Sequence, residues 1–220
     1  MKAPLVARLW RVYREKGVAG FWFGALRHAG YRRLMLLERT VGDPLPNLAA
    51  RVDATIRPLG LDDEAAFAAL GQEDPREFAR RLESGHQCWG AWVSGALRHV
   101  QWLALREAWI EHLGCRLRLH DGVLYVYRAF TQPEFRGAGL APATHCRGLD
   151  AMREQGCTLA LCGVAPGYRP ALVPWLKVGY RPIGFASTFG SARGRLLRVR
   201  LGPGAPASRG WTIETPGEPA

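Results

Sequence analysis

The pattern of apolar and polar residues along the 220-residue chain predicts short helices and short strands in one fold. Apolar residues recur at helical spacing over residues 4–16 and 18–39, with arginines at other positions. Strands are expected at Ala54–Leu59, Cys88–Val93, Ala96–Leu105, Val123–Phe130, Thr158–Gly163, Arg181–Thr188 and Arg195–Leu201. Helices are expected at about 63–70, 75–84, 140–155 and 170–178. This order predicts a mixed α/β (α+β) fold.

Composition divides the chain into three parts. The stretch from Gly42 to Asn47 is rich in Gly and Pro and reads as a linker. From Gly202 onward Gly, Pro, Ala and Ser dominate, which is typical of disordered segments. We therefore expect a basic helical extension at 1–45, a single folded domain at 46–202 and a disordered tail at 203–220.

The charge of the chain is concentrated at its beginning. The whole chain carries 30 Lys and Arg against 19 Asp and Glu, a net charge of +11. Residues 1–40 hold nine Lys or Arg and two Asp or Glu, a net +7, so the basicity belongs mostly to the expected extension. The extension could lie on an anionic membrane surface, or dock on its own domain or on a second subunit. The ordinary charge of the remainder disfavours nucleic acid as a partner.

The cysteines and the apolar runs indicate a cytoplasmic protein, with association to a membrane surface as the alternative. The five cysteines form neither a C-x-x-C pair nor a zinc-binding spacing, which predicts reduced, buried thiols and no metal site. The longest N-terminal apolar run, Gly17–Leu26, is shorter than the ~20 residues that a membrane-spanning helix needs.

The segment from Arg136 to Ala141, with sequence RGAGLA, joins a predicted strand to a predicted helix. Glycines at such a turn let backbone N–H groups converge, and the helix N-terminus adds partial positive charge. These features favour a pyrophosphate site, to which Arg136 adds a full charge. The alternative is a tight turn whose glycines serve only to reach positive φ. A Rossmann site is excluded because the G-x-G-x-x-G pattern is incomplete.

This segment resembles the acyl-CoA signature of the GNAT superfamily of N-acyltransferases, Q/R-x-x-G-x-G/A. Downstream, the stretch from Pro166 to Tyr180 resembles the second motif of the family, a short helix ending in lysine, an apolar residue, glycine and an aromatic residue. The resemblance covers about residues 52–201. It implies a mostly antiparallel, twisted sheet flanked by helices, with acetyl-CoA or another acyl-CoA as donor and no metal.

The resemblance also implies roles for individual residues. Loop amides would bind the CoA pyrophosphate, and the pantetheine arm would lie where the strand end at 129–131 splays from the next strand. Backbone N–H groups near Phe130 would polarise the thioester carbonyl. The implied cofactor-binding residues are Phe130, Thr131, Arg136, Gly137, Ala138, Gly139, Leu140 and Ala141.

Three positions depart from the family's pattern. Tyr168 stands where the family often has an asparagine, and Tyr125 where a strand glutamate often serves as base. Trp175 replaces the tyrosine that often protonates the departing thiolate, and an indole N–H is too weak an acid for this role. Tyr168 or water could supply the proton, or the thiolate could leave as an anion without an acid.

The general base is sought in the segment Trp109–Leu113, between the predicted hairpin and the motif strand. An amine nucleophile must lose a proton, so a carboxylate or histidine is needed within reach. Glu111 and His112 are the candidates; the alternative is an exposed edge strand with a solvated glutamate. The predicted catalytic set is Glu111, His112, Tyr125 and Tyr168.

The sequence thus predicts an N-acyltransferase that moves an acetyl or longer acyl group from acyl-CoA to an amine. The acceptor class expected is a small molecule such as an amino acid, amino sugar or peptide-like metabolite, attacking directly in a ternary complex. One alternative is a non-catalytic acyl-CoA-binding module. Another is a long-chain transferase using an acyl carrier protein, which the basic extension would meet. The oligomeric state is left open.

Overall fold

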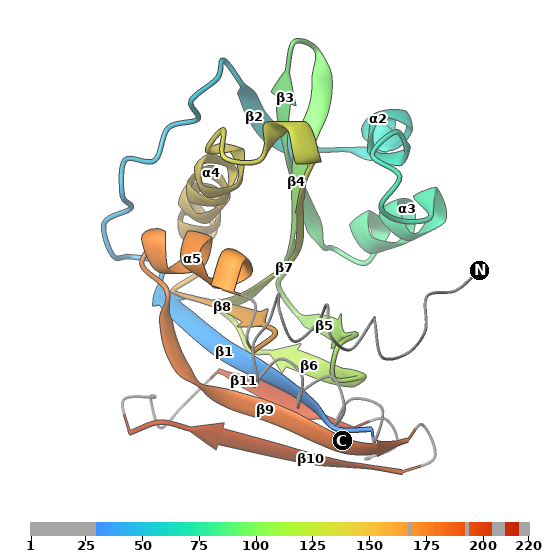
Figure 1. The fold of residues 1–220 in the computed structure, drawn as a ribbon, viewed down its shortest axis with the longest axis vertical. Helices are drawn as coiled ribbons and strands as arrows, with labels where there is room; N and C mark the ends of the chain where they lie inside the picture. The colour runs from blue at the N-terminus through green and yellow to red at the C-terminus, as the bar shows by residue number, and fades with distance from the viewer. Residues whose placement is uncertain (1–29, 167–168, 192–193, 204–209, 216–220) are drawn as a thin grey trace, which may run out of the picture.

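The computed structural model describes residues 30–166, 169–191, 194–203 and 210–215. It contains an eight-stranded sheet in the order β10-β9-β1-β8-β7-β4-β3-β2 and a three-stranded sheet in the order β11-β6-β5 (Figure 1). The large sheet consists of β1 (Arg32–Thr40), β2 (Thr55–Leu59), β3 (Gln87–Val93), β4 (Ala96–Ala104), β7 (Val123–Thr131), β8 (Leu159–Val164), β9 (Arg181–Ser191) and β10 (Gly194–Leu201). The small sheet consists of β5 (Glu107–Ile110), β6 (Cys115–Leu119) and β11 (Trp211–Glu214). Among the described residues, every pair of neighbouring strands is antiparallel except β7 with β8, which confirms the mixed, mostly antiparallel fold.

Helices cover both faces of the sheet around β4 and β7. The described helices are α2 (Glu64–Ala68), α3 (Pro75–Glu83), α4 (Leu140–Glu154) and α5 (Arg169–Lys177). Figure 1 shows α2 and α3 on one side of the strands β2, β3 and β4, and α4 and α5 on the other. Local signals explain why α3 begins where it does: the Asp74 side chain accepts a 3.0 Å hydrogen bond from the Arg76 N–H, and Pro75 occupies the first turn.

Strand β1 corrects the prediction of a helix over residues 18–39 and of an extension reaching to 45. Residues 32–40 form a strand that lies between β8 and β9 inside the sheet. Leu34 and Leu36 join the core on one face, and Leu37 joins the core on the other. A strand that is buried on both faces shows no alternation of polar and apolar residues. Its apolar run therefore does not distinguish a strand from a helix. Residues 1–29 of the predicted extension lie outside the described residues.

Strand β11 corrects part of the predicted disordered tail at 203–220. Residues 211–214 pair with β6 in the small sheet, and the Trp211 side chain is only 4% exposed. The aromatic ring supplies the burial that fixes this short strand, although its surroundings in the sequence are rich in Gly, Pro and Ala. Residues 204–209 and 216–220 of the tail lie outside the described residues.

The core consists of three apolar clusters arranged around the strands. One lies between the large and the small sheet, a second lies under α4 and α5, and a third lies under α2 and α3. All five cysteines are free, and all except Cys146 are buried. None of the helices in the described part of the chain is long and apolar enough to cross a membrane.

Candidate functional site

The parallel strands β7 and β8 separate halfway along their length. Their ladder runs from Val123 opposite Leu159 to Val126 opposite Cys162, where it ends. Beyond this point β7 continues to pair with β4 as far as Thr131, while β8 pairs with β1 as far as Val164. The opening therefore begins just before residues 129–131, where the sequence placed it.

A bulge lies at the start of this opening. Arg128 has a positive φ of 48°, and the β4–β7 register shifts between Val100 and Trp102. A bulge re-aims the side chains that follow it. Arg128 consequently turns toward the α3 side of the sheet, while Ala129 and Thr131 line a pocket on the α4–α5 side.

The glycine loop precedes the first turn of α4. Gly139 is the N-cap residue with φ 76°, and Gly137 also has positive φ, at 84°. Within the described residues, the N–H groups of Gly139, Leu140 and Ala141 have no backbone carbonyl partner. Three free donors thus converge at the positive end of a 15-residue helix, an arrangement that suits a phosphate.

The segment that follows the predicted linker crosses this loop and contacts it. The Arg51 N–H donates a 2.8 Å hydrogen bond to the Ala138 carbonyl. A Cβ added at Gly139 would lie 3.1 Å from the Ala49 carbonyl oxygen, so glycine is required there by the crossing segment. The crossing also brings a second arginine, Arg51, next to the loop that carries Arg136, and both residues are exposed.

The first pocket, which we call the α4–α5 pocket, has a volume of about 170 Å³. It is lined by His99, Gln101, Ala129, Thr131, Ala141, Pro142, Ala171, Pro174, Trp175 and Val178. His99 Nδ1 lies 2.7 Å from Thr131 Oγ1. His99 Nε2 and Gln101 Nε2 are buried and have no hydrogen-bond partner among the described residues. The pocket thus contains polar groups that a ligand or water could satisfy.

A second buried histidine lies behind Trp175. The His145 ring meets the Trp175 ring edge-on, with centroids 4.9 Å apart, and lies 5.3 Å from the ring of Tyr180. Burial lowers the pKa of both His99 and His145 to about 3, so both imidazoles are neutral at neutral pH. Neither ring nitrogen of His145 has a partner among the described residues.

The second pocket, which we call the α3-side pocket, has a volume of about 870 Å³ and lies on the opposite face of β7. It is lined by Glu77, Arg80, Arg81, Glu83, Ser84, Gly85, His86, Leu105, Arg106, Glu107, Ala108, Trp109, Glu111, Arg116, Tyr127 and Arg128. Five arginines and four glutamates line it, so both signs of charge are available to a ligand.

His86 and Tyr127 form a hydrogen-bonded pair in the α3-side pocket, with His86 Nδ1 2.6 Å from the Tyr127 hydroxyl oxygen. Burial, with smaller contributions from Arg81 and Arg80, lowers the pKa of His86 below its ordinary value of 6.5. Burial raises the pKa of Tyr127. At neutral pH the pair therefore consists of a neutral imidazole and a neutral phenol.

Glu111 also lies in the α3-side pocket, as part of a chain of ion pairs. Its carboxylate contacts Arg128, which contacts Glu73, which in turn contacts Arg81 at 2.5 Å. The Glu111 side chain is exposed, on the turn after β5. The segment Trp109–Leu113 thus contributes to the α3-side pocket, but the Glu111 carboxylate is paired with the Arg128 guanidinium.

The other predicted catalytic residues lie elsewhere. His112 Nε2 is 2.9 Å from the Arg33 carbonyl oxygen, and His112 does not line the α3-side pocket, so it is not brought together with Glu111. Tyr125 is 5% exposed in the core and stacks on Tyr127, with centroids 5.8 Å apart; burial raises its pKa. Phe130 packs against the cluster under α2 and α3. Tyr168 lies outside the described residues.

Sequence reasoning missed His86, His99 and Arg51 as site residues. His86 follows the predicted end of α3, and nothing local distinguishes it from an ordinary loop histidine. His99 lies on β4 and Arg51 in the segment after the linker, and both reach the site only through contacts with residues far along the chain.

Comparison with known proteins supports the fold. No model of a known protein family matches the sequence, and no curated protein matches it. Among solved structures, a GCN5-related N-acetyltransferase from Sphaerobacter thermophilus matches 82% of this chain and 56% of its own, with TM-score 0.54 and 15% identity. A tandem GNAT protein from the clavulanic acid biosynthesis pathway matches 76% of this chain and 55% of its own, with TM-score 0.50 and 16% identity. The chain has the fold of the GNAT N-acetyltransferases and spans just over half the length of these two structures.

Proposed function

We propose that this protein is an acyl-CoA-dependent N-acyltransferase that acts on the amine of a small molecule. The observation that carries the proposal is the pair of pockets on opposite faces of β7 where it parts from β8. One pocket adjoins a phosphate-binding loop and the other contains an acid–base pair. A donor and an acceptor can therefore approach one strand end from two sides, as a ternary complex requires.

The donor is proposed to bind on the α4–α5 side. The pyrophosphate of CoA accepts hydrogen bonds from the N–H groups at the start of α4, with Arg136 and Arg51 supplying charge. The pantetheine arm enters the α4–α5 pocket, where the unpartnered Nε2 atoms of His99 and Gln101 meet its amide groups. Backbone N–H groups near Phe130 polarise the thioester carbonyl.

The acceptor is proposed to bind in the α3-side pocket. An amino acid or a peptide-like metabolite carries a carboxylate as well as an amine, and the arginines of this pocket match the carboxylate. The glutamates of this pocket can pair with the ammonium group of the acceptor as it enters the pocket. The mixture of charges favours a zwitterionic acceptor over an apolar one, and an amino sugar is the weaker fit.

The proposed chemistry places His86 as the general base. In the tautomer that donates from Nδ1 to the Tyr127 oxygen, Nε2 is free to accept the proton of the attacking amine. The amine nitrogen forms a bond to the thioester carbon, the C–S bond breaks, and CoA leaves as a thiolate. Trp175 cannot protonate this thiolate, so water or Tyr168 is the proposed proton source. Glu111 stays the second candidate for the base, although its carboxylate is already paired with Arg128.

The test is mass spectrometry of full-length protein incubated with a ladder of acyl-CoA lengths and a pool of amines. Transfer is expected as a mass increase on one class of amine together with release of CoA thiol. The same reaction with an acylated carrier protein as donor tests the long-chain alternative. Binding of CoA with no transfer to any amine would favour the non-catalytic module, for which the replacement of the acid tyrosine by Trp175 is the supporting observation.

A further inference from the structure

The outer face of strands β1, β9 and β10 contains a surface cavity of about 240 Å³, far from both pockets of the candidate site along the sheet. Strand register places side chains of this face in rows. Arg33, Ser187 and Arg198 are partners in one row, and Phe185 and Arg200 are partners in the next. We call this surface the β1–β9–β10 face.

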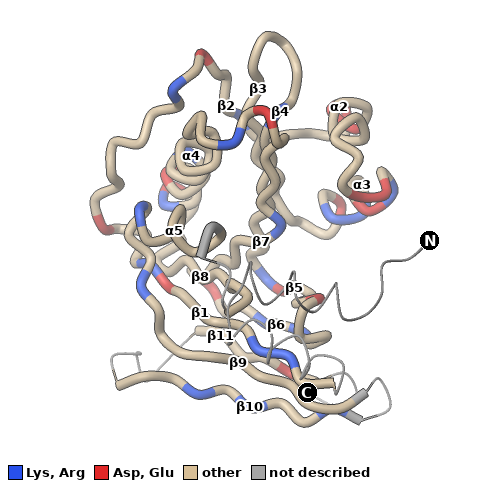
Figure 2. The backbone as a smooth tube through the Cα atoms, in the orientation of Figure 1, with Lys and Arg blue, Asp and Glu red and all other residues tan. Residues whose placement is uncertain are grey.

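Among the residues that the structure describes, the arginines of the β1–β9–β10 face have no anionic partner. In the described part of the chain, neither Arg33, Arg198 nor Arg200 forms an ion pair, and strands β9 and β10 contain no Asp or Glu. Figure 2 shows the basic positions on β10 without an acidic neighbour on that strand. By contrast, Arg80, Arg81 and Arg128 in the α3-side pocket are all paired.

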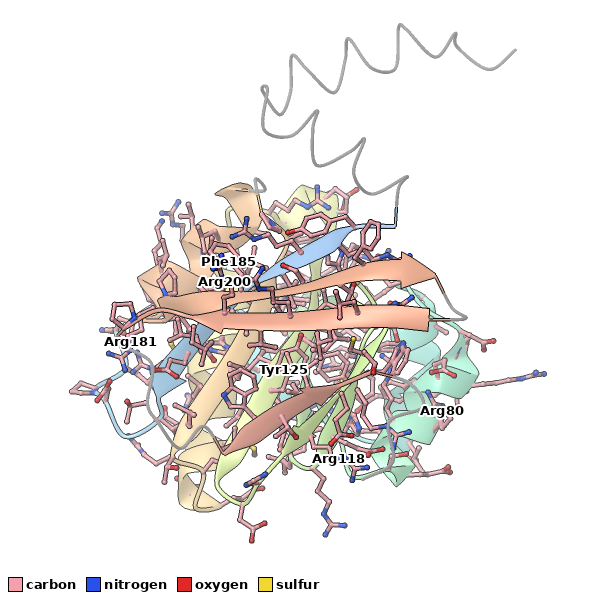
Figure 3. The ribbon with its side chains drawn as sticks, turned by 90° about the horizontal axis from the view of Figure 1, so that it is seen from below. Arg80, Arg118, Tyr125, Arg181, Phe185 and Arg200 are labelled. Carbon is pink, nitrogen blue, oxygen red and sulfur yellow. The ribbon has the colours of Figure 1, made fainter. Side chains whose placement is uncertain are left out.

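The side chain of Arg33 shows how strongly this face lacks a counter-charge. Its guanidinium lies 3.8 Å from the centroid of the Phe185 ring, and its Nε is buried with no hydrogen-bond partner among the described residues. Figure 3 shows Phe185 and Arg200 close together on this side of the sheet, as their register requires. Three like charges that line one cavity repel one another, and a bound phosphate removes that repulsion.

Apolar side chains adjoin the arginines on the same face. Leu196 and Phe189 are register partners, and they are 72% and 56% exposed. Large apolar side chains beside unpaired cations are typical of surfaces that enter the boundary between lipid headgroups and acyl chains. A free phosphate in water would satisfy the arginines and leave Phe189 and Leu196 exposed. The combination therefore favours a lipid surface over a soluble phosphate.

The chain that precedes β1 adds to the attraction. Residues 1–29 contain six Lys or Arg and one Glu, and they join the described structure at Gly30. The neighbouring Tyr31 lines the same cavity, and its hydroxyl lies 3.3 Å from Ser187 Oγ. A basic segment thus enters the fold at the edge of the β1–β9–β10 face.

We propose that the β1–β9–β10 face binds an anionic phospholipid surface. Arg33, Arg198 and Arg200 hold lipid phosphates, and Phe189 and Leu196 enter the interfacial region of the bilayer. This inference is independent of the proposed transferase activity.

The test uses full-length protein and vesicles of phosphatidylcholine, alone or mixed with phosphatidylglycerol, in a sedimentation assay. Binding to the mixed vesicles only is expected. The double variant Arg198→Gln/Arg200→Gln should lower the partition coefficient about 25-fold, since each charge near an anionic surface accounts for about fivefold. The matched control Arg147→Gln/Arg153→Gln removes two exposed charges from α4 and should change it by less than about twofold.

The variant Phe189→Ser/Leu196→Ser tests the apolar part and should weaken binding at high salt, where the electrostatic part is screened. Circular dichroism checks that each variant is folded, which is expected because the four changed side chains are exposed. An equal loss in the control variant would overturn the proposal, as would binding unaffected by either double variant. Glycerol phosphate that abolishes vesicle binding at matched ionic strength would identify a soluble phosphate as the ligand instead. Self-association that the Phe189→Ser/Leu196→Ser variant removes would identify a second copy of the chain.

Discussion

The two pockets beside β7 differ in how their polar groups are satisfied. The α4–α5 pocket is small, about 170 Å³, and His99 and Gln101 leave buried nitrogens without partners among the described residues. The α3-side pocket is about 870 Å³, and the arginines Arg80, Arg81 and Arg128 are already paired with glutamates. An unsatisfied buried polar group costs about 1–3 kcal/mol, whereas a satisfied, solvated ion pair costs little.

This difference indicates that the two pockets tolerate changes in their ligand to different degrees. The α4–α5 pocket gains most from a ligand of one shape whose polar groups meet the orphaned nitrogens, as expected for a constant donor such as acyl-CoA. Most charged side chains of the α3-side pocket are paired without a ligand, so it can exchange one acceptor for another at small cost. We therefore expect strict recognition of the donor and broader recognition of the acceptor.

The largest expected effect concerns the loop on the donor side. Gly139→Val should abolish detectable CoA binding, because its Cβ would lie 3.1 Å from the Ala49 carbonyl oxygen and displace the loop and its crossing segment. Gly137→Val is the matched control: Gly137 also has positive φ, but a Cβ there meets nothing within 4 Å. Calorimetric titration with CoA measures the binding, and circular dichroism reports folding.

The two variants distinguish the effect of backbone strain from the effect of the contact that a side chain at residue 139 makes with Ala49. Both place a β-branched residue at positive φ, which costs stability in either case. If the Gly139→Val variant is folded and binds CoA like the wild type, the loop does not hold the cofactor. The proposal that the donor binds on the α4–α5 side is then wrong. Equal loss in both variants would mean that the approach of the new side chain to Ala49 is not the cause.

The features predicted correctly from the sequence depend on neighbours along the chain. The turn at Gly137 and Gly139 and the helix that follows are local, so glycine spacing and apolar periodicity were enough to place them. The strands β1 and β11 depend on partners far away: Leu36 pairs with Gly163 and Gly184, and Trp211 pairs with Leu119. Pairing of that range leaves no local pattern, and an apolar run alone could not decide between helix and strand.

The residues of the candidate site could likewise be predicted only where the signal is local in the sequence or comes from the family resemblance. Glu111 was found because its segment precedes the motif strand, and Thr131 because the family resemblance names that strand end. His86 reaches Tyr127 across 41 positions, and Arg51 reaches Ala138 across a still longer separation, so neither could be assigned from spacing. The bulge at Arg128, which turns this side chain toward Glu111, also has no signal in the sequence because Arg is unusual at positive φ.

The second prediction tests the acid–base pair on the acceptor side. His86→Gln should lower kcat/KM by roughly 10²–10⁴, the range for loss of a general base, with CoA affinity unchanged. Because burial and nearby arginines lower the His86 pKa below its ordinary value, the fall in wild-type rate that accompanies protonation of the imidazole should lie at a lower pH than for an exposed histidine. Steady-state kinetics across pH measures both effects.

Glu111→Gln provides the matched comparison in the same pocket. It keeps the size of the side chain and removes the ion pair with Arg128. If Glu111→Gln shows the large loss and His86→Gln does not, Glu111 is the base and the His86–Tyr127 pair serves only to position the acceptor.

The third prediction concerns charge on the donor side. Arg136→Ala should weaken CoA binding by about 1.5 kcal/mol, the lower end of the range for hydrogen bonds to charged groups, because Arg136 is exposed and water screens its charge. Arg51→Ala should have a similar effect if the crossing segment supplies the second cation. Calorimetry at two salt concentrations measures both, and Arg147→Ala on the exposed surface of α4 is the control. A loss that does not shrink with salt would contradict an electrostatic role.

The last prediction concerns stability rather than binding or rate: it is a pH dependence to which the two buried histidines of the donor side contribute most. His99 and His145 have a folded pKa of about 3 and an unfolded pKa of about 6.5, so between these values the unfolded state binds protons that the folded state does not. The free energy of unfolding should therefore fall as pH drops below 6.5, by about 2 kcal/mol for each histidine at pH 5.

The variant His145→Phe tests this expectation. It keeps an aromatic ring between Trp175 and Tyr180 but cannot be protonated, so it should remove about half of this pH dependence. Urea unfolding at pH 7 and pH 5 measures the change, with the exposed His120→Gln as control. A slope that is the same in His145→Phe and in the wild type would mean that the ring is hydrated in solution, and that the α4–α5 side is less dry than its unpartnered nitrogens indicate.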